Sequence, residues 1–227
     1  MYPAVRSAFP DFTRQFEGAI PFMYLDVKGF VTTGIGNLID PVDAALKLPW
    51  RSKKTKAPAS QKEIRDEWTT VKGRTDLENT LAVKGSAWDK LTTLELTDAD
   101  IASLVDGKLS DNEAALKKYF PDFDKWPADA QLATLSMAWA MGPDFVPTFP
   151  SFKKAALAQD WDKAGEQCHI SEAGNPGVAP RNRADKLLFS NAARVKNNPG
   201  VYQTGVLYYP TMLMDPVVIR AGSAPNP

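Results

Sequence analysis

The chain has one cysteine and one histidine among its 227 residues, and this scarcity excludes several kinds of site. Cys168 has no second cysteine with which to form an intrachain disulfide. Cys168 and His169 could supply two zinc ligands, but the sequence has no further Cys or His to complete the site. A serine or cysteine nucleophile would depend on His169 without any supporting motif. We therefore expect no metal site, and we expect Cys168 to be buried in the core.

The sequence also lacks an excess of charge of either sign, because 27 Lys and Arg residues balance 27 Asp and Glu residues. Proteins that bind nucleic acids non-specifically usually carry surplus positive charge. The balance therefore counts against nucleic acid as a partner.

Long apolar runs are missing as well. No window approaches about 18 uninterrupted apolar residues, so we expect no transmembrane helix. The opening residues, MYPAVRSAFPDF, lack a basic region followed by an apolar run. No signal peptide is therefore visible, and we expect synthesis in the cytoplasm. The remaining composition, 44% hydrophobic and 24% charged, is that of an ordinary soluble globular protein with one sizeable core.

The most informative stretch runs from Phe16 to Asn37 and reads FEGAIPFMYLDVKGFVTTGIGN. It predicts the end of a helix at Glu17, because Gly18 can adopt the left-handed conformation that stops a helix. Two aromatic and β-branched runs follow, Phe22–Leu25 and Phe30–Thr33, with a short glycine-containing connection between them. Such a pattern predicts a β-hairpin.

This hairpin would place acidic and hydroxyl side chains on one side of a cleft. Asp26 lies on its first arm and Thr32 on its second, so strand pairing can bring them together. Glycoside hydrolysis needs two carboxyl groups in unlike environments, one protonated and one ionised. Glu17 has apolar neighbours, whereas Asp26 lies in a turn beside Lys28. The alternative is a surface hairpin with two solvated carboxylates.

The residues around these three side chains form a more specific pattern. The pattern consists of Glu17-Gly18, Tyr24-x-Asp26-x-x-Gly29 and Thr32-x-Gly34-Ile35-Gly36. It resembles the active-site stretch of the phage-type lysozymes, the T-even phage lysozyme family (glycoside hydrolase family 24). The resemblance implies that Glu17 is the general acid and that Asp26 and Thr32 hold and activate the attacking water. It also implies substrate contacts at Asn37 and Leu38, although the family usually has His at the Asn37 position.

A later motif extends the resemblance. The family's closing motif is Pro followed by Asn-Arg-Ala, and here Arg181 intervenes between Pro180 and Asn182-Arg183-Ala184. By this match Arg183 would pair with the catalytic Glu17. A nearby cation lowers a carboxyl pKa, whereas burial raises it, and the sequence leaves the balance open. A plain surface arginine is the competing interpretation of Arg183.

Several helices are predicted by periodicity and by capping residues. Phe9, Phe12 and Phe16 give a helix over residues 5–17, with Pro10 in its first turn. The predicted helices further along are Val42 to Leu48, a helix through Val71 opened by Ser60-x-x-Glu63, one from Thr97 to Tyr119, and the apolar Ala128 to Met141.

Two segments lie outside the resemblance. Residues 49–95 form an insert with a basic cluster between Arg51 and Lys56. It is either an added rim that contacts polysaccharide or a partner through the cluster and Trp50, or a solvated loop with a packing helix, which we favour. Residues 198–227 form a C-terminal extension that packs on the domain or docks a partner. Within it, Val206–Tyr209 and Val217–Ile219 could pair as strands or lie against the core.

We therefore expect an α+β, lysozyme-like fold with a cleft between a small hairpin lobe and a larger helical lobe. Residues 1–197 would form one catalytic domain, with the hairpin lobe at about 20–48 and the helical lobe at 1–19 plus 96–197. The resemblance implies a muramidase that hydrolyses the β-1,4 bond between N-acetylmuramic acid and N-acetylglucosamine of bacterial peptidoglycan, with inversion. Carboxyl chemistry of this kind needs no cofactor.

Other interpretations stay open at this point. The enzyme could be a lytic transglycosylase, or the chain could be an inactive lysozyme-like module that binds the cell wall. The setting could be a phage endolysin, a virion-associated lysin or an injected antibacterial effector. An immunity protein, a virion or a secretion system would then be its partner. We expect a monomer that acts on the periplasmic cell wall after release or delivery.

Overall fold

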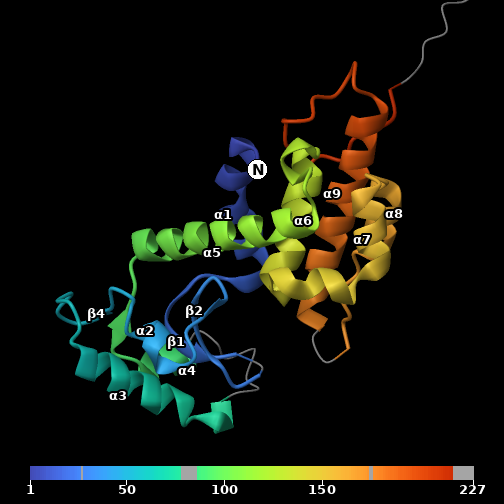
Figure 1. Cartoon of the computed structure of the whole chain (residues 1–227). Coiled ribbons are helices and arrows are strands. Elements are labelled where there is room, and N and C mark those ends of the chain that lie inside the picture. Colours follow the sequence, from blue (N-terminus) through green and yellow to red (C-terminus); the bar gives the residue numbers. More distant parts are fainter. Residues whose placement is uncertain (27, 78–85, 174–175, 217–227) are drawn as a thin grey trace, which may run out of the picture. The chain divides into compact units, whose positions relative to one another are not determined.

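The computed structural model describes residues 1–26, 28–77, 86–173 and 176–216 (Figure 1). The fold is α+β, with a small antiparallel sheet near the N-terminus and a mostly helical remainder. The chain divides into two compact units. The hairpin unit is Phe9–Asp111, and the helical unit combines Met1–Ala8 with Asn112–Pro227.

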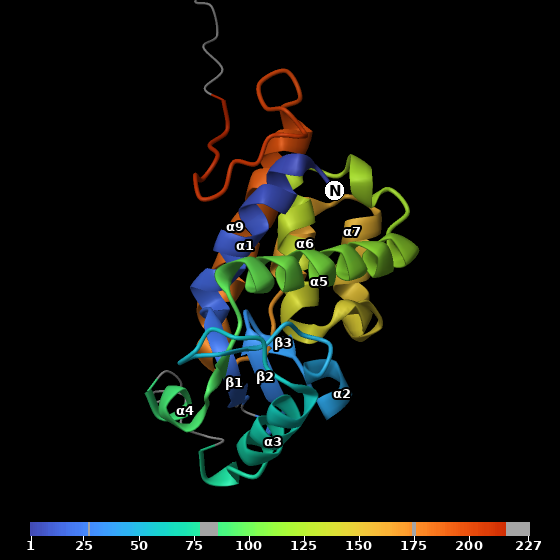
Figure 2. The same cartoon turned by 90° about the vertical axis from the view of Figure 1, so that its left-hand side faces the viewer.

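The sheet of the hairpin unit confirms the predicted hairpin. Strands β1 (Ile20–Leu25), β2 (Val31–Gly34) and β3 (Asn37–Leu38) pair antiparallel in sequence order, and Figure 2 shows them side by side. Directly opposite positions are Tyr24 with Thr32 and Thr32 with Leu38. These residues therefore form one row across the sheet, because cross-strand partners point to the same face.

Helix α1 (Pro3–Glu17) begins earlier than predicted, and the placement of Pro10 in its first turn is wrong. Pro10 lies inside the helix, while Pro3 occupies the first position. A proline inside a helix removes one hydrogen bond and costs about 3 kcal/mol. Phe9 and Phe12 on either side of it are fully or almost fully buried, and this burial offsets that loss.

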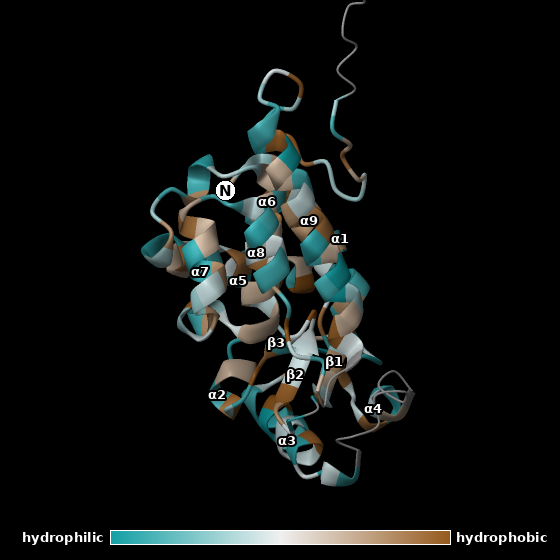
Figure 3. Ribbon diagram, turned by 90° about the vertical axis from the view of Figure 1, so that its right-hand side faces the viewer, coloured by the Kyte–Doolittle hydropathy of each residue, from teal (hydrophilic) through white to brown (hydrophobic). Residues whose placement is uncertain are grey.

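The insert folds against the sheet as helices and a two-stranded ribbon. The short helix α2 (Val42–Ala45) precedes the insert. The helices of the insert are α3 (Gln61–Lys72) and α4 (Ser86–Leu91), with a 3-10 turn η1 (Thr75–Leu77) after α3, and its strands are β4 (Arg51–Ser52) and β5 (Leu94–Glu95). The predicted capping box of Ser60 and Glu63 is confirmed at the start of α3. Helix α3 carries both hydrophilic and hydrophobic segments (Figure 3) and packs on β1 and β2.

Helix α5 (Asp98–Tyr119) confirms the predicted helix that follows Thr97. The Oγ1 of Thr97 accepts from the Asp100 amide at 3.0 Å, and Oδ2 of Asp100 accepts from the Thr97 amide at 2.8 Å. This reciprocal pair satisfies two amides that the helix itself leaves without acceptors. Residues of α1 and α5 belong to both units.

The helical unit is built around α6 (Ala128–Met141), which confirms the predicted buried helix. The elements that complete this unit are the 3-10 turns η3 (Phe123–Lys125), η4 (Pro143–Thr148) and η5 (Pro176–Val178) and the helices α7 (Pro150–Leu157), α8 (Trp161–Gln167) and α9 (Ala179–Asn197). Aromatic side chains fill its core. The ring centroids of Trp126 and Trp161 are 4.9 Å apart, and Phe152 lies 5.5 Å from Phe189.

The described part of the C-terminal extension, residues 198–216, lies against α6 and α9. Buried Asp129 accepts from the amides of Tyr208 and Tyr209 at 2.9 and 3.1 Å. Buried Asn191 accepts from the amide of Leu213 at 2.9 Å and donates to the carbonyl of Thr211 at 2.8 Å. Residues 206–209 form no strand, and the predicted strand at Val217–Ile219 lies outside the described residues.

Candidate active site

Glu17 is the last residue of α1, as the sequence predicts. Gly18 follows with φ of +71°, a conformation that glycine adopts without strain, and its amide donates to the Arg14 carbonyl at 2.9 Å. The side chain of Glu17 is half-buried. The helix end therefore fixes the backbone of the predicted general acid.

The turn between β2 and β3 lies directly against the Glu17 carboxyl group. Gly34 and Gly36 have φ of +61° and +67°. A Cβ atom at Gly36 would lie 3.3 Å from Oε2 of Glu17 and 3.5 Å from its carboxyl carbon. The Nζ of Lys108 donates to the carbonyl of Gly36 at 3.1 Å, which fixes the turn from the side of α5. Glycine at position 36 thus permits a close approach of backbone to carboxylate.

Asp26 follows β1 and organises the hairpin turn. Its Oδ1 accepts from the amides of Lys28 and Phe30 at 2.8 and 2.9 Å, and its own amide donates to the Phe30 carbonyl at 2.9 Å. Oδ2 has no hydrogen-bond partner among the described residues. The carboxylate is half-buried, so one oxygen holds the turn while the other is available to a water molecule.

Thr32 lies in the middle strand and is 4% exposed. Its Oγ1 donates to the Phe30 carbonyl at 3.3 Å, which leaves the oxygen able to accept a further hydrogen bond. Tyr24 is its cross-strand partner, and Asp26 stands two residues beyond Tyr24. Because side chains alternate along a strand, this register brings the two predicted water-binding residues to the same face of the sheet.

Tyr24 is a site residue to which the sequence assigned no role. Its pKa is raised above the ordinary value, first by burial and then by the negative charges of Glu17 and Asp26. The buried phenol of Tyr24 therefore interacts electrostatically with both carboxylates. The signal in the sequence was its position two residues before Asp26. Lys108 was also missed, although it follows buried Ile101 and Val105 at helical spacing on α5.

The two predicted substrate-binding residues have different environments. Asn37 is 7% exposed, and its Oδ1 accepts from the Ile35 amide at 3.2 Å, so this side chain stabilises the turn before β3. Leu38 is 57% exposed beside Thr32, as a side chain available to a ligand would be. Substrate contact stays a prediction for both residues.

Arg183 lies in α9 of the helical unit, and its side chain is exposed. Its pairing with Glu17, a residue of the hairpin unit, stays a prediction. The intervening Arg181 is instead buried, at 1% exposure, and donates to the carbonyl and Oγ of Ser136 at 3.2 and 3.0 Å. Arg181 therefore links α9 to α6 inside the helical unit.

Three of the four basic residues in the cluster of the insert, which also contains Lys54, pair with acidic residues. The pairs are Arg51 with Asp100 at 3.6 Å, Lys53 with Asp89 at 2.8 Å and Lys56 with Glu95 at 2.6 Å. Trp50 is 2% exposed and donates to the Ala45 carbonyl, so its side chain offers almost no surface for a rim contact. A pocket of about 280 Å³ nearby includes no predicted catalytic residue among its lining residues, Leu48–Arg51, Lys56, Pro58, Ala59, Gln61, Ile64 and Asp100.

Two further sequence-based expectations concern Cys168 and membranes. Cys168 is buried, which confirms its placement in the core, and burial raises the pKa of its thiol to about 12.

No helix in the described part of the chain is long and apolar enough to cross a membrane. The described residues contain no cluster of three or more His, Cys, Asp or Glu side chains suited to a metal ion.

No known protein-family model matches this chain, and no curated protein matches it in sequence. A functional assignment therefore depends on the arrangement of these side chains and on the resemblance of the motif around Glu17.

Proposed function

We propose that this protein is a peptidoglycan muramidase with a lysozyme-like fold. It hydrolyses the β-1,4 bond between N-acetylmuramic acid and N-acetylglucosamine, with Glu17 as general acid. Asp26 and Thr32 bind and activate the attacking water. The biological setting is a phage endolysin, a virion-associated lysin or an injected antibacterial effector, each of which delivers the enzyme to the cell wall.

The observation that carries this proposal is the arrangement of side chains around Tyr24. Thr32 is its partner across the strand pair and Asp26 follows it by two residues, while Glu17 lies against Gly36 in the turn after β2. Burial raises the pKa of the Tyr24 phenol, and the charges of Glu17 and Asp26 raise it further. The two carboxyl groups also differ in surroundings, as glycoside hydrolysis requires. Glu17 lies against the backbone of Gly36, while Asp26 accepts hydrogen bonds from two amides of the hairpin turn.

The proposed reaction is a single displacement. Glu17 donates its proton to the bridging oxygen as the bond from that oxygen to the anomeric carbon breaks. The water held by Asp26 and Thr32 forms a new bond to the same carbon from the opposite face and gives a proton to Asp26. Inversion by this route needs the two carboxyl groups about 6.5–9.5 Å apart, which leaves room for the water. Thr32 would orient that water through its remaining lone pair.

A lytic transglycosylase is the closest alternative enzyme. It would use Glu17 as the acid but no carboxylate to activate water, because the 6-hydroxyl of the muramic acid attacks instead. The availability of Oδ2 of Asp26 beside Thr32 favours hydrolysis. Mass spectrometry of the released fragments distinguishes the two, since only the transglycosylase yields anhydromuramic ends.

The deciding experiment is the Glu17→Gln variant in a cell-wall clearing assay. Loss of a general acid should reduce the rate by about 10²–10⁴-fold, while the thermal unfolding midpoint stays close to that of the wild type. Glu166→Gln is a suitable control, because Glu166 is an exposed residue of α8. A wild-type protein that clears no wall would identify an inactive wall-binding module, and equal clearing by Glu17→Gln would disprove the assigned role.

A further inference from the structure

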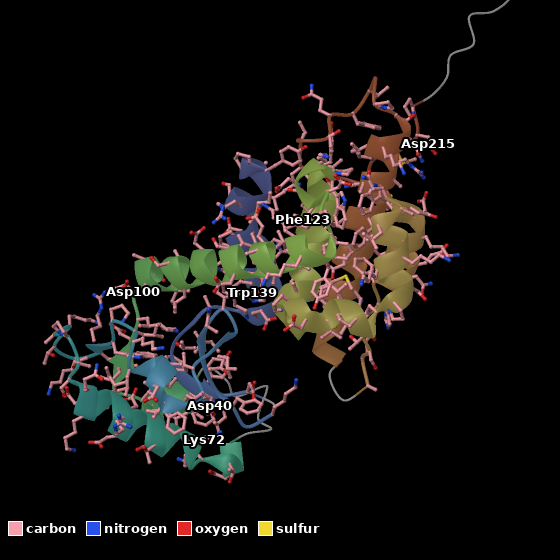
Figure 4. The ribbon with its side chains drawn as sticks, viewed as in Figure 1. Asp40, Lys72, Asp100, Phe123, Trp139 and Asp215 are labelled. Carbon is pink, nitrogen blue, oxygen red and sulfur yellow. The ribbon has the colours of Figure 1, made fainter. Side chains whose placement is uncertain are left out.

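Lys72, in the last turn of α3, is bound to the hairpin rather than to its own helix. Its Nζ donates to the carbonyl of Gly29 at 2.8 Å and to Oδ2 of Asp40 at 2.6 Å. The same amine lies 5.4 Å from the ring centroid of Phe30. Figure 4 shows Lys72 and Asp40 next to each other. A residue of the insert therefore contacts the turn that holds Asp26.

The contacts of Lys72 continue to the backbone that joins the two predicted water-binding residues. Gly29 lies in the turn, where its amide donates to the Asp26 carbonyl at 3.1 Å. Asp40 accepts from the amide of Val31 at 3.2 Å, and Val31 is the first residue of β2 and the neighbour of Thr32. Lys72 thus supports the backbone just after Asp26 and just before Thr32.

A second residue of α3 makes a parallel contact. The indole Nε1 of Trp68 donates to the carbonyl of Ile39 at 2.9 Å, and Trp68 lies one turn before Lys72 on the same helix face. Helix α3 is thus bound to two successive residues, Ile39 and Asp40. Helix α3 belongs to the insert, so these hydrogen bonds attach the insert to the hairpin.

We propose that Lys72 is a positioning residue that fixes the geometry of Asp26 and Thr32 in the reaction proposed above. A misplacement of about 1 Å at a reacting group can reduce a rate about a hundredfold. The side chains of Lys72 and Asp40 are 37% and 14% exposed, so solvent weakens their ion pair. The substitution should therefore affect turnover more strongly than it affects unfolding.

The first test compares Lys72→Met with Lys62→Met in kinetics on soluble peptidoglycan fragments. Lys62 lies on the same helix and pairs with Asp66 across one turn, at 85% exposure. We expect Lys72→Met to lower kcat about ten- to a hundredfold, with KM changed less than about twofold. Lys72→Arg, which keeps a cationic donor, should retain more of kcat than Lys72→Met does. Unchanged kcat in Lys72→Met would overturn the proposal.

A second test does not need catalysis. Amide hydrogen exchange at Lys28 and Phe30 reports the two hydrogen bonds to Oδ1 of Asp26. We expect faster exchange at these amides in Lys72→Met and unchanged exchange in Lys62→Met. Exchange that is unaffected at both amides, or that rises equally across the whole hairpin unit, would overturn the positioning role. If the wild type proves inactive, the proposed function fails, and the exchange measurement still decides whether Lys72 holds the turn.

Discussion

The carboxyl group of Glu17 and the backbone of Gly36 are close enough that a Cβ at Gly36 would lie 3.3 Å from Oε2. The end of a helix and the turn after a strand thus approach each other across 19 positions of sequence. Only glycine offers both the positive φ and the missing side chain that this approach requires.

Replacing Gly36 with Ala should therefore impair both folding and activity. The positive φ costs an alanine about 1 kcal/mol, and the new methyl group displaces the Glu17 carboxyl. We expect the unfolding free energy to fall by about 1–2 kcal/mol and clearing of the cell wall to fall at least tenfold. Urea unfolding and the clearing assay measure the two effects.

Gly107→Ala is the matched control for that substitution. Gly107 is an exposed residue inside α5, and a Cβ there would meet nothing within 4 Å. Because alanine favours the helix, this variant should be stabilised by up to about 1 kcal/mol, with unchanged activity. Equal losses in both variants would show that the contact between Gly36 and Glu17 has no special role.

Leu38→Ala should weaken substrate binding without affecting the fold. Leu38 is 57% exposed and stands beside Thr32 in the sheet, so its removal leaves little cavity. We expect KM for peptidoglycan fragments to rise several-fold while the melting temperature stays constant. Leu157→Ala, which removes a similarly exposed leucine of α7, should leave KM unchanged.

Glu67 is expected to be a strong determinant of the stability of the insert. It is 8% exposed and accepts from the amides of Thr93 and Leu94, at 2.5 Å and 3.1 Å. In Glu67→Gln the remaining carbonyl oxygen can replace Oε2, but the amide nitrogen then faces the Leu94 amide 3.2 Å away, and the negative charge that strengthens these hydrogen bonds is lost. We expect a loss of about 2–3 kcal/mol in unfolding free energy, measured in urea. The exposed Glu166→Gln should change the unfolding free energy by less than about 0.5 kcal/mol.

Asp185 should make the stability of the protein depend on pH. Burial raises the pKa of this carboxyl from 3.8 to about 7, against the opposing effects of Arg181 and Ser136. Between these two pH values the folded state keeps a proton that the unfolded state releases. The contribution of Asp185 to stability should therefore fall as pH rises from 4 to 7, with a slope of up to about 1.4 kcal/mol per pH unit.

Thermal melting of Asp185→Asn between pH 4 and pH 8 checks this expectation. The variant cannot ionise at position 185, so its midpoint should vary less with pH than that of the wild type. Asp162→Asn, at an exposed position of α8, should keep the wild-type dependence. An equal dependence of the midpoint on pH in the wild type and in Asp185→Asn would contradict the assignment to Asp185.

Much of the local structure was predictable because its causes lie within a few residues. Gly18 ends α1, the runs around the Asp26 turn form the hairpin, and Ser60 and Thr97 begin their helices as predicted. The apolar sequence of α6 likewise indicated burial. Each of these structures is encoded by a short run of neighbouring residues, so it could be predicted from the sequence alone.

The contacts that complete the candidate site have no such local cause. Lys108 reaches Gly36 across 72 positions, and Lys72 reaches Asp40 across 32. Strands β4 and β5 are two residues long and pair across the whole insert, so neither had a recognisable pattern. Pro10 was misplaced because the burial of its neighbours overrides the local preference.

The tryptophans provide a means to follow the two units separately in solution. Trp50, Trp68 and Trp88 belong to the hairpin unit, and the other three of the six, Trp126, Trp139 and Trp161, belong to the helical unit. Most of these indoles are buried, so their fluorescence should change when the surrounding structure opens. Phenylalanine substitutions confined to one unit would leave emission from the other, and denaturation curves of the two sets would reveal whether the units unfold together.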